Sequence, residues 1–401
     1  MRTTTLAARS LRKASVPPTL LSDPSPGSLP PTRLAVHVNG AGSCCSAYLA
    51  SGCHVYNIEI NMDGEMLFKG KESLLIPDNA QIISSSVVDR CPHRSEIQSV
   101  ALAEGGEGEN CLILGTVDSY GHLIVSRLDT VADDMDRTSY SVPPRDCGVG
   151  EGSWAGVCFS PMHRSMVAVG RQLCKSIDVY DQDIHLRSFR TLWYPSSFSF
   201  LQCSSQVNES SSLLAIAEGS QLSIWDLRMN NNGGCVQRIS GSVGNVLYSI
   251  CSSPSGPIAT GGTDRTVTIY DPRRWSALSR WVGCSKYEIT GLSFSSVDQS
   301  FIYVQGVDYE ITCGLWKENE RAFSFRGDSN WLGFSKCADT DVIAGWCESG
   351  NIFIADVSAT VVFLAKPTGH IEENKIAINQ ESTGQIGITG FLDHEDSPSC
   401  I

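Results

Sequence analysis

The sequence lacks long apolar segments and metal-binding cysteine motifs, although it contains 16 cysteines. No stretch approaches the roughly 18 to 20 apolar residues of a membrane-spanning helix, and the N-terminus has no continuous apolar region typical of a secretory signal. No Cys-x-x-Cys pair occurs and the histidines do not cluster near the cysteines, so the sequence predicts no zinc site. We therefore expect reduced thiols and a location in the nucleus or the cytoplasm. Several cysteines fall inside strand patterns, where Cys serves as a small apolar residue: Cys158, Cys251, Cys313 and Cys337.

The sequence also has no recognisable catalytic motif. The Gly-x-Ser-x-Gly pattern is absent, and the eight histidines lie apart in the chain. A glycine-rich run at 148–152 precedes a strand-like segment and lacks the Gly-Lys-Ser/Thr ending of a phosphate-binding loop. We therefore predict that the protein is not an enzyme and binds no cofactor, metal or small-molecule substrate.

Basic residues are in the minority. The chain has 30 Lys and Arg against 43 Asp and Glu, for a net charge of −13. A general nucleic-acid-binding surface needs dense Lys and Arg, so we expect no direct binding to nucleic acid. The acidity aids solubility and is compatible with protein partners that carry basic patches.

What the sequence does contain is a repeating unit. A strand of small residues is followed by a tight turn and by an alternating strand that ends in an aromatic–acid pair. Period-two alternation with frequent turn signals indicates strands rather than helices. The spacing of the later units, about 40 to 47 residues, is typical of four-stranded blades. The small-residue strands centre near residues 48, 113, 168, 215, 259, 304 and 344.

Two of these units come closest to a known pattern. Residues 213–228 contain a Trp225-Asp226 pair, and residues 258–273 contain Tyr270-Asp271 after a run of small residues. Both units resemble WD-repeats. The resemblance implies an all-β fold, a single seven-bladed β-propeller over residues 33–366, in which a terminal strand closes the ring. The candidates for that strand are residues 33–38 and 361–365.

The same two segments carry a more specific similarity. Residues 258–273 are similar to the box found in WD-repeat substrate receptors of cullin-4 ubiquitin ligases, in which the box arginine and its neighbours face the propeller adaptor of the ligase. Residues 213–228 form a poorer copy, in which Gly219 replaces the turn residue Asp264. The similarity implies a non-catalytic scaffold that acts as a substrate receptor, with a partner-binding patch made of Trp225, Asp226, Arg228, Tyr270, Asp271 and Arg273.

Two other functions remain open at this point. The propeller could be an interaction subunit of a nuclear, trafficking or RNA-processing complex. Alternatively, its channel could read a modified peptide through an aromatic cage around a cationic group. The aromatic residues of the innermost strands that could contribute to such a cage are Trp154, Tyr248 and Phe294.

Both ends of the chain differ from the repeats. Residues 1–32 are basic and rich in Ser, Thr and Pro, which predicts a disordered segment. The same composition also fits an organellar transit peptide or a basic tail that docks on a partner or is phosphorylated. Residues 367–401 are acidic and lack repeat signals, which predicts a flexible tail.

Overall fold

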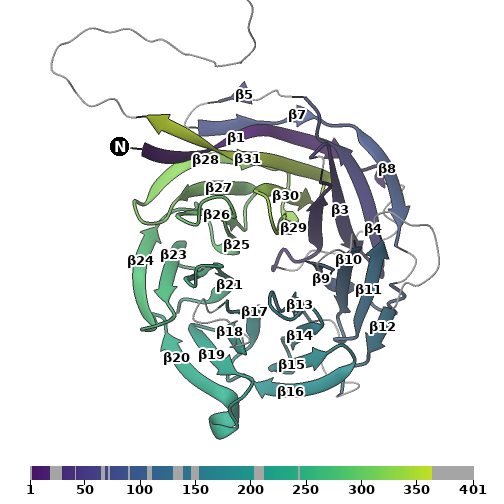
Figure 1. Cartoon of the computed structure of the whole chain (residues 1–401), viewed down its shortest axis with the longest axis vertical. Helices are drawn as coiled ribbons and strands as arrows, with labels where there is room; N and C mark the ends of the chain where they lie inside the picture. Colours follow the sequence, from purple (N-terminus) through teal and green to yellow (C-terminus); the bar gives the residue numbers. More distant parts are fainter. Residues whose placement is uncertain are drawn as a thin grey trace, which may run out of the picture.

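The computed structural model describes residues 2–18, 29–40, 42–64, 68–70, 73–88, 91–105, 111–129, 139–145, 153–202, 212–242 and 244–363. Within these ranges the chain forms seven sheets arranged in a ring, which is a seven-bladed β-propeller (Figure 1). The prediction of an all-β propeller is therefore confirmed. No helix among these residues is long and apolar enough to cross a membrane.

Blades one to three come first in the chain. From the centre of the ring to its rim, their strands are β2 (Leu34–Val38), β3 (Cys44–Ser51), β4 (His54–Asn61) and β8 (Ile82–Val87) in blade one; β9 (Ile97–Glu104), β10 (Cys111–Asp118), β11 (Leu123–Asp129) and β12 (Ser139–Val142) in blade two; and β13 (Ala155–Phe159), β14 (Met166–Arg171), β15 (Ser176–Asp181) and β16 (Ile184–Arg190) in blade three.

Blades four to seven follow with the same order of strands. They are β17 (Pro195–Phe200), β18 (Leu213–Glu218), β19 (Gln221–Asp226) and β20 (Cys235–Ser240) in blade four; β21 (Leu247–Ser252), β22 (Ile258–Gly262), β23 (Thr266–Asp271) and β24 (Ser276–Val282) in blade five; β25 (Ile289–Phe294), β26 (Phe301–Gly306), β27 (Glu310–Leu315) and β28 (Glu320–Arg326) in blade six; and β29 (Trp331–Lys336), β30 (Val342–Cys347) and β31 (Asn351–Phe363) in blade seven. A short 3-10 helix, η3 (Asn231–Gly234), precedes β20.

Each of the seven small-residue centres falls in the second strand of a blade: β3, β10, β14, β18, β22, β26 and β30. The second strand is paired on both edges and packs against a neighbouring blade on each face. Small residues stand where the backbones approach closely, beside buried large side chains such as Tyr303 and Trp346. In β22, a Cβ atom at Gly262 would collide with the backbone of Val246, and one at Gly261 would collide with Ile289 of the next blade. The runs of small residues in the sequence therefore mark positions where neighbouring segments approach closely.

The ring is closed by the N-terminal strand β1 (Arg2–Ser15), which pairs antiparallel with β31 as the fourth strand of blade seven. The prediction of a disordered segment is therefore wrong for residues 2–15, while residues 19–28 and the predicted acidic tail at 367–401 lie outside the described residues. The predicted closing segment 33–38 does not close the ring, whereas residues 361–363 of the other candidate take part in the closure. β2 is the innermost strand of blade one, and the end of β31 from Val361 to Phe363 pairs with Arg2–Thr4.

The basic residues of β1 explain why its sequence was misleading. Arg9 pairs with Asp356 at 2.8 Å, Lys13 pairs with Asp328 at 3.0 Å, and the Arg12 guanidinium donates to the carbonyl of Gly64. These cations hold a strand in place within the ring. The apolar residues of the strand are small or widely spaced, but they are buried: Leu6, Ala8, Leu11 and Ala14.

A segment inserted between β4 and β8 reinforces the closure. It leaves blade one and adds strands to the rims of two other blades (Figure 1). β7 (Asp78–Asn79) pairs parallel with β1 of blade seven, and β6 (Leu74–Ile76) pairs parallel with β28 of blade six and antiparallel with β5 (Phe68–Lys69). Leu75 is buried in the same core cluster as Phe323 and Phe325. The insertion therefore connects blade one to blades six and seven by strand pairing.

Candidate interaction surfaces

The alternation of strand direction sorts the loops onto two faces of the ring. The first and third strands of each blade run in the same direction, so their C-terminal ends reach one face. Arg228 follows the third strand β19 and Arg273 follows the third strand β23, so both lie on this face, which we call the Arg228 face. The opposite face carries the turns between second and third strands and the connections between blades. We call it the Trp193 face, because Trp193 lies in the connection between β16 and β17.

The two aromatic residues of the predicted patch are placed differently. Trp225 is 2% exposed, its ring lies 5.2 Å from that of Phe189, and its indole N–H donates to Ser223 at 2.9 Å. Tyr270 is partly buried and packs against the cluster between blades four and five. Trp225 is therefore a core residue that packs beneath the surface of the predicted patch and is not itself part of that surface.

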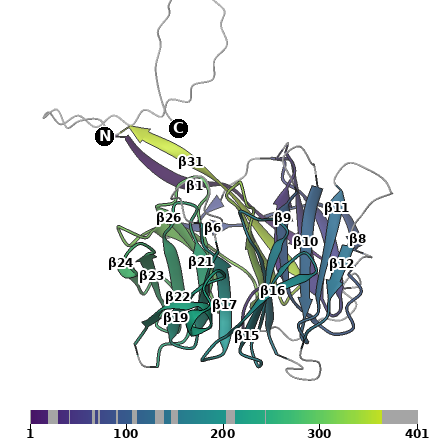
Figure 2. The same ribbon diagram turned by 60° about the horizontal axis from the view of Figure 1, so that its bottom comes forward.

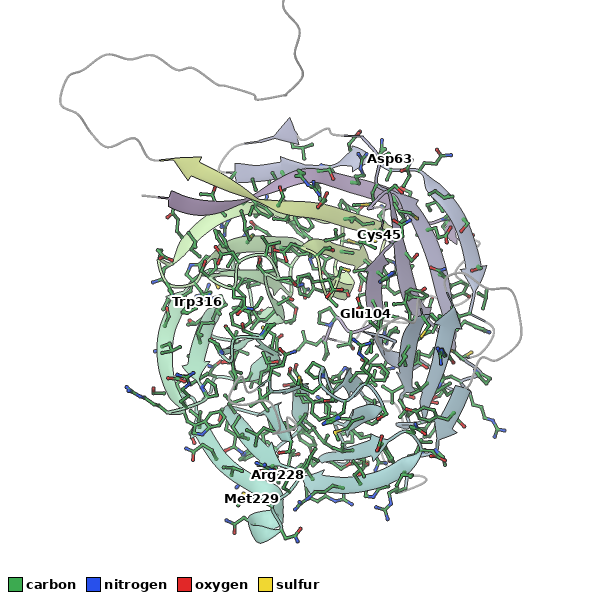
Figure 3. The ribbon with its side chains drawn as sticks, in the orientation of Figure 1. Cys45, Asp63, Glu104, Arg228, Met229 and Trp316 are labelled. Atoms are coloured by element: carbon green, nitrogen blue, oxygen red, sulfur yellow. The ribbon has the colours of Figure 1, made fainter. Side chains whose placement is uncertain are left out.

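Asp226 and Arg228 form a closed pair in blade four. Asp226 accepts hydrogen bonds from the Arg228 backbone N–H at 2.9 Å, from Nε at 3.2 Å and from Nη2 at 3.1 Å. Burial of Asp226 opposes its ionisation, but these hydrogen bonds outweigh burial and lower the pKa of the carboxyl. The Arg228 side chain remains 58% exposed, at the outer part of the ring next to Met229 (Figure 3).

The equivalent residues of blade five form a more open arrangement. The Asp271 carboxylate accepts the backbone N–H of Arg273 at 2.9 Å, and the Asp271 carbonyl accepts the N–H groups of Trp275 at 2.7 Å and Arg274 at 3.2 Å. The Arg273 side chain is exposed and makes no ion pair within the described part of the chain. The patch therefore presents one arginine that is held by its own blade and one that is not.

The turn of blade five is built as the repeat pattern predicts. Asp264 accepts the N–H of Thr266 at 3.1 Å and lies 3.8 Å from Arg280. Asn245, from the connection before β21, accepts both Thr263 Oγ1 at 2.8 Å and Asp264 N–H at 3.2 Å. In blade four, Gly219 takes the place of this aspartate with φ of +57°. Asp264 is therefore a turn residue on the Trp193 face, away from the arginine patch.

The structure brings together two histidines that lie apart in the sequence. His93 Nδ1 lies 3.2 Å from Asp118 and its Nε2 lies 2.7 Å from Thr116 Oγ1, while His122 Nδ1 lies 3.9 Å from Asp118. Three such groups could hold a cation. However, both ring nitrogens of His93 are already hydrogen-bonded to protein groups. We therefore interpret this cluster as a set of hydrogen bonds that connects the segment before β9 to β10 and the turn after it.

A cavity of about 320 Å³ lies among the innermost strands. Its lining includes Glu104, whose position near the ring centre is visible in Figure 3, together with His37, Lys336 and Phe334. A hydrogen bond with Asp339, burial and charge repulsion together raise the pKa of Glu104. The aromatic cage suggested by the sequence does not form here, because Trp154 and Phe294 are buried in core clusters and neither they nor Tyr248 line this cavity.

Four of the predicted strand cysteines can be placed. Cys158, Cys251 and Cys313 lie in β13, β21 and β27, and Cys337 directly follows β29. Burial raises the pKa of Cys158 to about 11 and that of Cys251 to about 12, so both stay protonated near neutral pH. These residues serve as packing groups, as expected.

The sequence matches no family model, and no curated protein matches it at a significant level. The architecture is therefore the main guide to function. A β-propeller commonly serves as a scaffold for protein–protein interactions, because its rigid ring presents loops on two faces.

Sequence reasoning missed one set of exposed residues. Trp193 and Tyr194, on the face opposite to the arginine patch, are 56% and 51% exposed. The available signal was the Leu-Trp-Tyr-Pro run at 192–195, which joins two strands and breaks their alternation. Figure 2, in which the ring is turned, shows β16 and β17, between which this connection lies.

Proposed function

We propose that this protein is a non-catalytic scaffold of the WD-repeat type, and that its Arg228 face binds the propeller adaptor of a cullin-4 ubiquitin ligase. The observation that carries the proposal is the placement of Arg228 and Arg273 at equivalent positions of neighbouring blades, both exposed on one face. A planar guanidinium can bind a carboxylate or several carbonyl groups of a partner in a defined orientation. We place this activity in the nucleus or the cytoplasm.

The supporting residues have distinct roles in this proposal. Trp225 and Tyr270 anchor the ends of β19 and β23, and Asp226 and Asp271 hold the backbone that follows each strand. The two arginines would make the contacts with the adaptor. A second candidate function, an interaction subunit of another intracellular complex, uses the same exposed face with a different partner.

The test is affinity purification of the full chain from cells, read by mass spectrometry, beside the double variant Arg228→Ala/Arg273→Ala. The matched control is Arg265→Ala, an exposed arginine in the turn of blade five on the Trp193 face. We expect the wild type and the control to capture the adaptor and the double variant to lose it. Capture of a different recurrent complex that depends on both arginines would favour the second candidate. Capture of the adaptor by all three proteins would contradict the role of the arginines.

A further inference from the structure

The Trp193 face carries a cluster of exposed apolar side chains where blades three, four and five meet. Large apolar residues that are this exposed and lie together mark interaction sites on protein surfaces. We call the cluster the Trp193 surface. Its members are Leu173 (51% exposed), Leu192 (55%), Trp193 (56%), Tyr194 (51%) and Val246 (37%).

Backbone hydrogen bonds join the three loops that form this surface. Thr191 N–H donates to the carbonyl of Lys175 at 2.9 Å, which connects the turn of blade three to the connection that bears Trp193. Gly219 N–H donates to the carbonyl of Tyr194 at 3.4 Å, and its own carbonyl accepts Leu247 N–H at 2.8 Å. The five apolar residues therefore belong to one continuous stretch of the face.

Trp193 is held in its exposed position by buried groups. The Glu218 carboxylate, which is 0% exposed, accepts the backbone N–H groups of Leu192 at 2.7 Å and Trp193 at 3.0 Å. Thr191 Oγ1 donates to the Trp193 carbonyl at 2.7 Å, and Gly219 lets the Trp193 side chain pack closely over the turn. The loop is thus fixed before any partner arrives, which reduces the entropy lost on binding.

The exposed charges nearest to Trp193 are basic. Lys175 Nζ lies 4.7 Å from the centroid of the Tyr194 ring and donates to the Leu192 carbonyl at 3.4 Å, and the exposed Arg190 donates to the Cys174 carbonyl at 3.3 Å. Residues 171–175, 190–196, 217–221 and 244–247 contain one carboxylate, that of Glu218, and it is buried. At the blade-five edge, Asp264 donates its backbone N–H to Asn245, and its carboxylate lies 3.8 Å from Arg280. The surface is therefore basic and aromatic, on a chain whose net charge is −13.

We infer that the Trp193 surface binds an acidic segment of another protein. An aromatic or aliphatic residue of that segment would cover Trp193, and neighbouring carboxylates would face Lys175 and Arg190. Exposed Trp, Tyr and Arg are the residues that most often dominate binding energy at interfaces. This inference goes beyond the proposed function and does not depend on the adaptor.

The test measures binding of the full chain to a fluorescent random copolymer of glutamate and tyrosine, by anisotropy. We expect binding that weakens with added salt, and weaker binding to polyglutamate of equal length, because it lacks an apolar side chain. The variant Trp193→Ala/Tyr194→Ala should weaken binding by at least about tenfold. The variant Lys175→Glu/Arg190→Glu, which keeps the apolar residues, should also weaken it.

The matched control is Leu278→Ala/Val282→Ala, which removes two apolar residues that are more than half exposed from the outer strand of blade five. It should bind the copolymer as the wild type does.

Equal binding by the wild type and both Trp193-surface variants, or no binding by the wild type, would overturn the inference. Tighter binding of a single-stranded oligonucleotide than of the copolymer would also overturn it, in favour of a nucleic-acid surface. Tighter binding of a synthetic peptide of residues 367–401 would overturn it by making the chain's own tail the occupant. Adaptor capture by the Trp193→Ala/Tyr194→Ala variant should be unchanged, which separates this inference from the proposed function.

Discussion

Blades four and five carry the same pattern at the end of their third strands, yet they use it differently. In blade four, Asp226 binds both the backbone and the guanidinium of Arg228. In blade five, the Asp271 carboxylate binds the backbone of Arg273 and not its guanidinium, and the side chain of that arginine is exposed without an ion pair in the described residues. The aspartate therefore stabilises the turn in both blades. Only in blade five is the arginine side chain not bound by that aspartate.

The difference extends to the aromatic residue of each pair. Trp225 is enclosed by Phe189 and by the guanidinium of Arg238, which lies 5.4 Å from its ring. Tyr270 is only partly buried. A match to a repeat pattern thus does not determine whether a given residue supports the blade or reaches a partner, because burial depends on the neighbouring strands.

The largest effect should come from the aromatic positions. Trp225→Ala removes a side chain that is 2% exposed and should lower the free energy of unfolding by about 3 to 5 kcal/mol. Tyr270→Ala should cost clearly less, because part of that ring already faces water. Urea unfolding at pH 7 measures both values, and equal losses would contradict the contrast between the blades.

The aspartates should show the next largest difference. Asp226→Ala leaves a mostly buried site without the acceptor for three hydrogen bonds and should cost about 1 to 3 kcal/mol. Asp271→Ala removes one acceptor at an exposed turn and should cost no more than about 1 kcal/mol. Urea unfolding measures both losses of stability. A larger loss for Asp271→Ala than for Asp226→Ala would contradict the assignment of the closed pair to blade four and the open pair to blade five.

The closed pair also predicts a pH dependence. The folded pKa of Asp226 is lowered, so its carboxylate stabilises the fold above the unfolded pKa of about 3.9, and this contribution is lost as the pH falls through the folded value. The stability difference between the wild type and Asp226→Asn should therefore be larger at pH 7 than at pH 3. Thermal unfolding at both pH values tests this, with Arg228→Ala as the variant in which the pH dependence should be reduced. A difference that grows as the pH falls would contradict the prediction.

The arginines should have the smallest effect on stability and the clearest effect on binding. Arg228→Ala removes an exposed ion pair and should cost about 0.2 to 1 kcal/mol, while Arg273→Ala should change stability by less than about 0.5 kcal/mol. Adaptor capture should fall more for Arg273→Ala, because Arg228 must share its donors with Asp226. Titration of purified adaptor against each single variant measures this, and a larger loss for Arg228→Ala would place the main contact in blade four.

Local pattern was sufficient for the repeats but not for the ring closure. The second strands could be predicted because close packing requires small residues at some of their positions, as at Gly261 and Gly262. The closing strand β1 could not, since its small apolar residues are interleaved with arginine and threonine, and its partners Asp356 and Asp328 lie more than 300 residues away in the chain. The insertion that joins blades one, six and seven was missed for the same reason, because its strands are short and find their partners across the closure.

By itself, the sequence determined the number of blades, the position of every second strand and the two segments with an aromatic–acid pair, because strand alternation and small-residue runs are local signals. Only the tertiary structure decided which arginine is held by its own blade, where His93 meets Asp118, and that Trp193 is presented outward above the buried Glu218. These properties depend on contacts between segments that are distant in sequence. The physical reason is that burial and hydrogen-bond partners are set by the neighbouring blades rather than by the residues next in the chain.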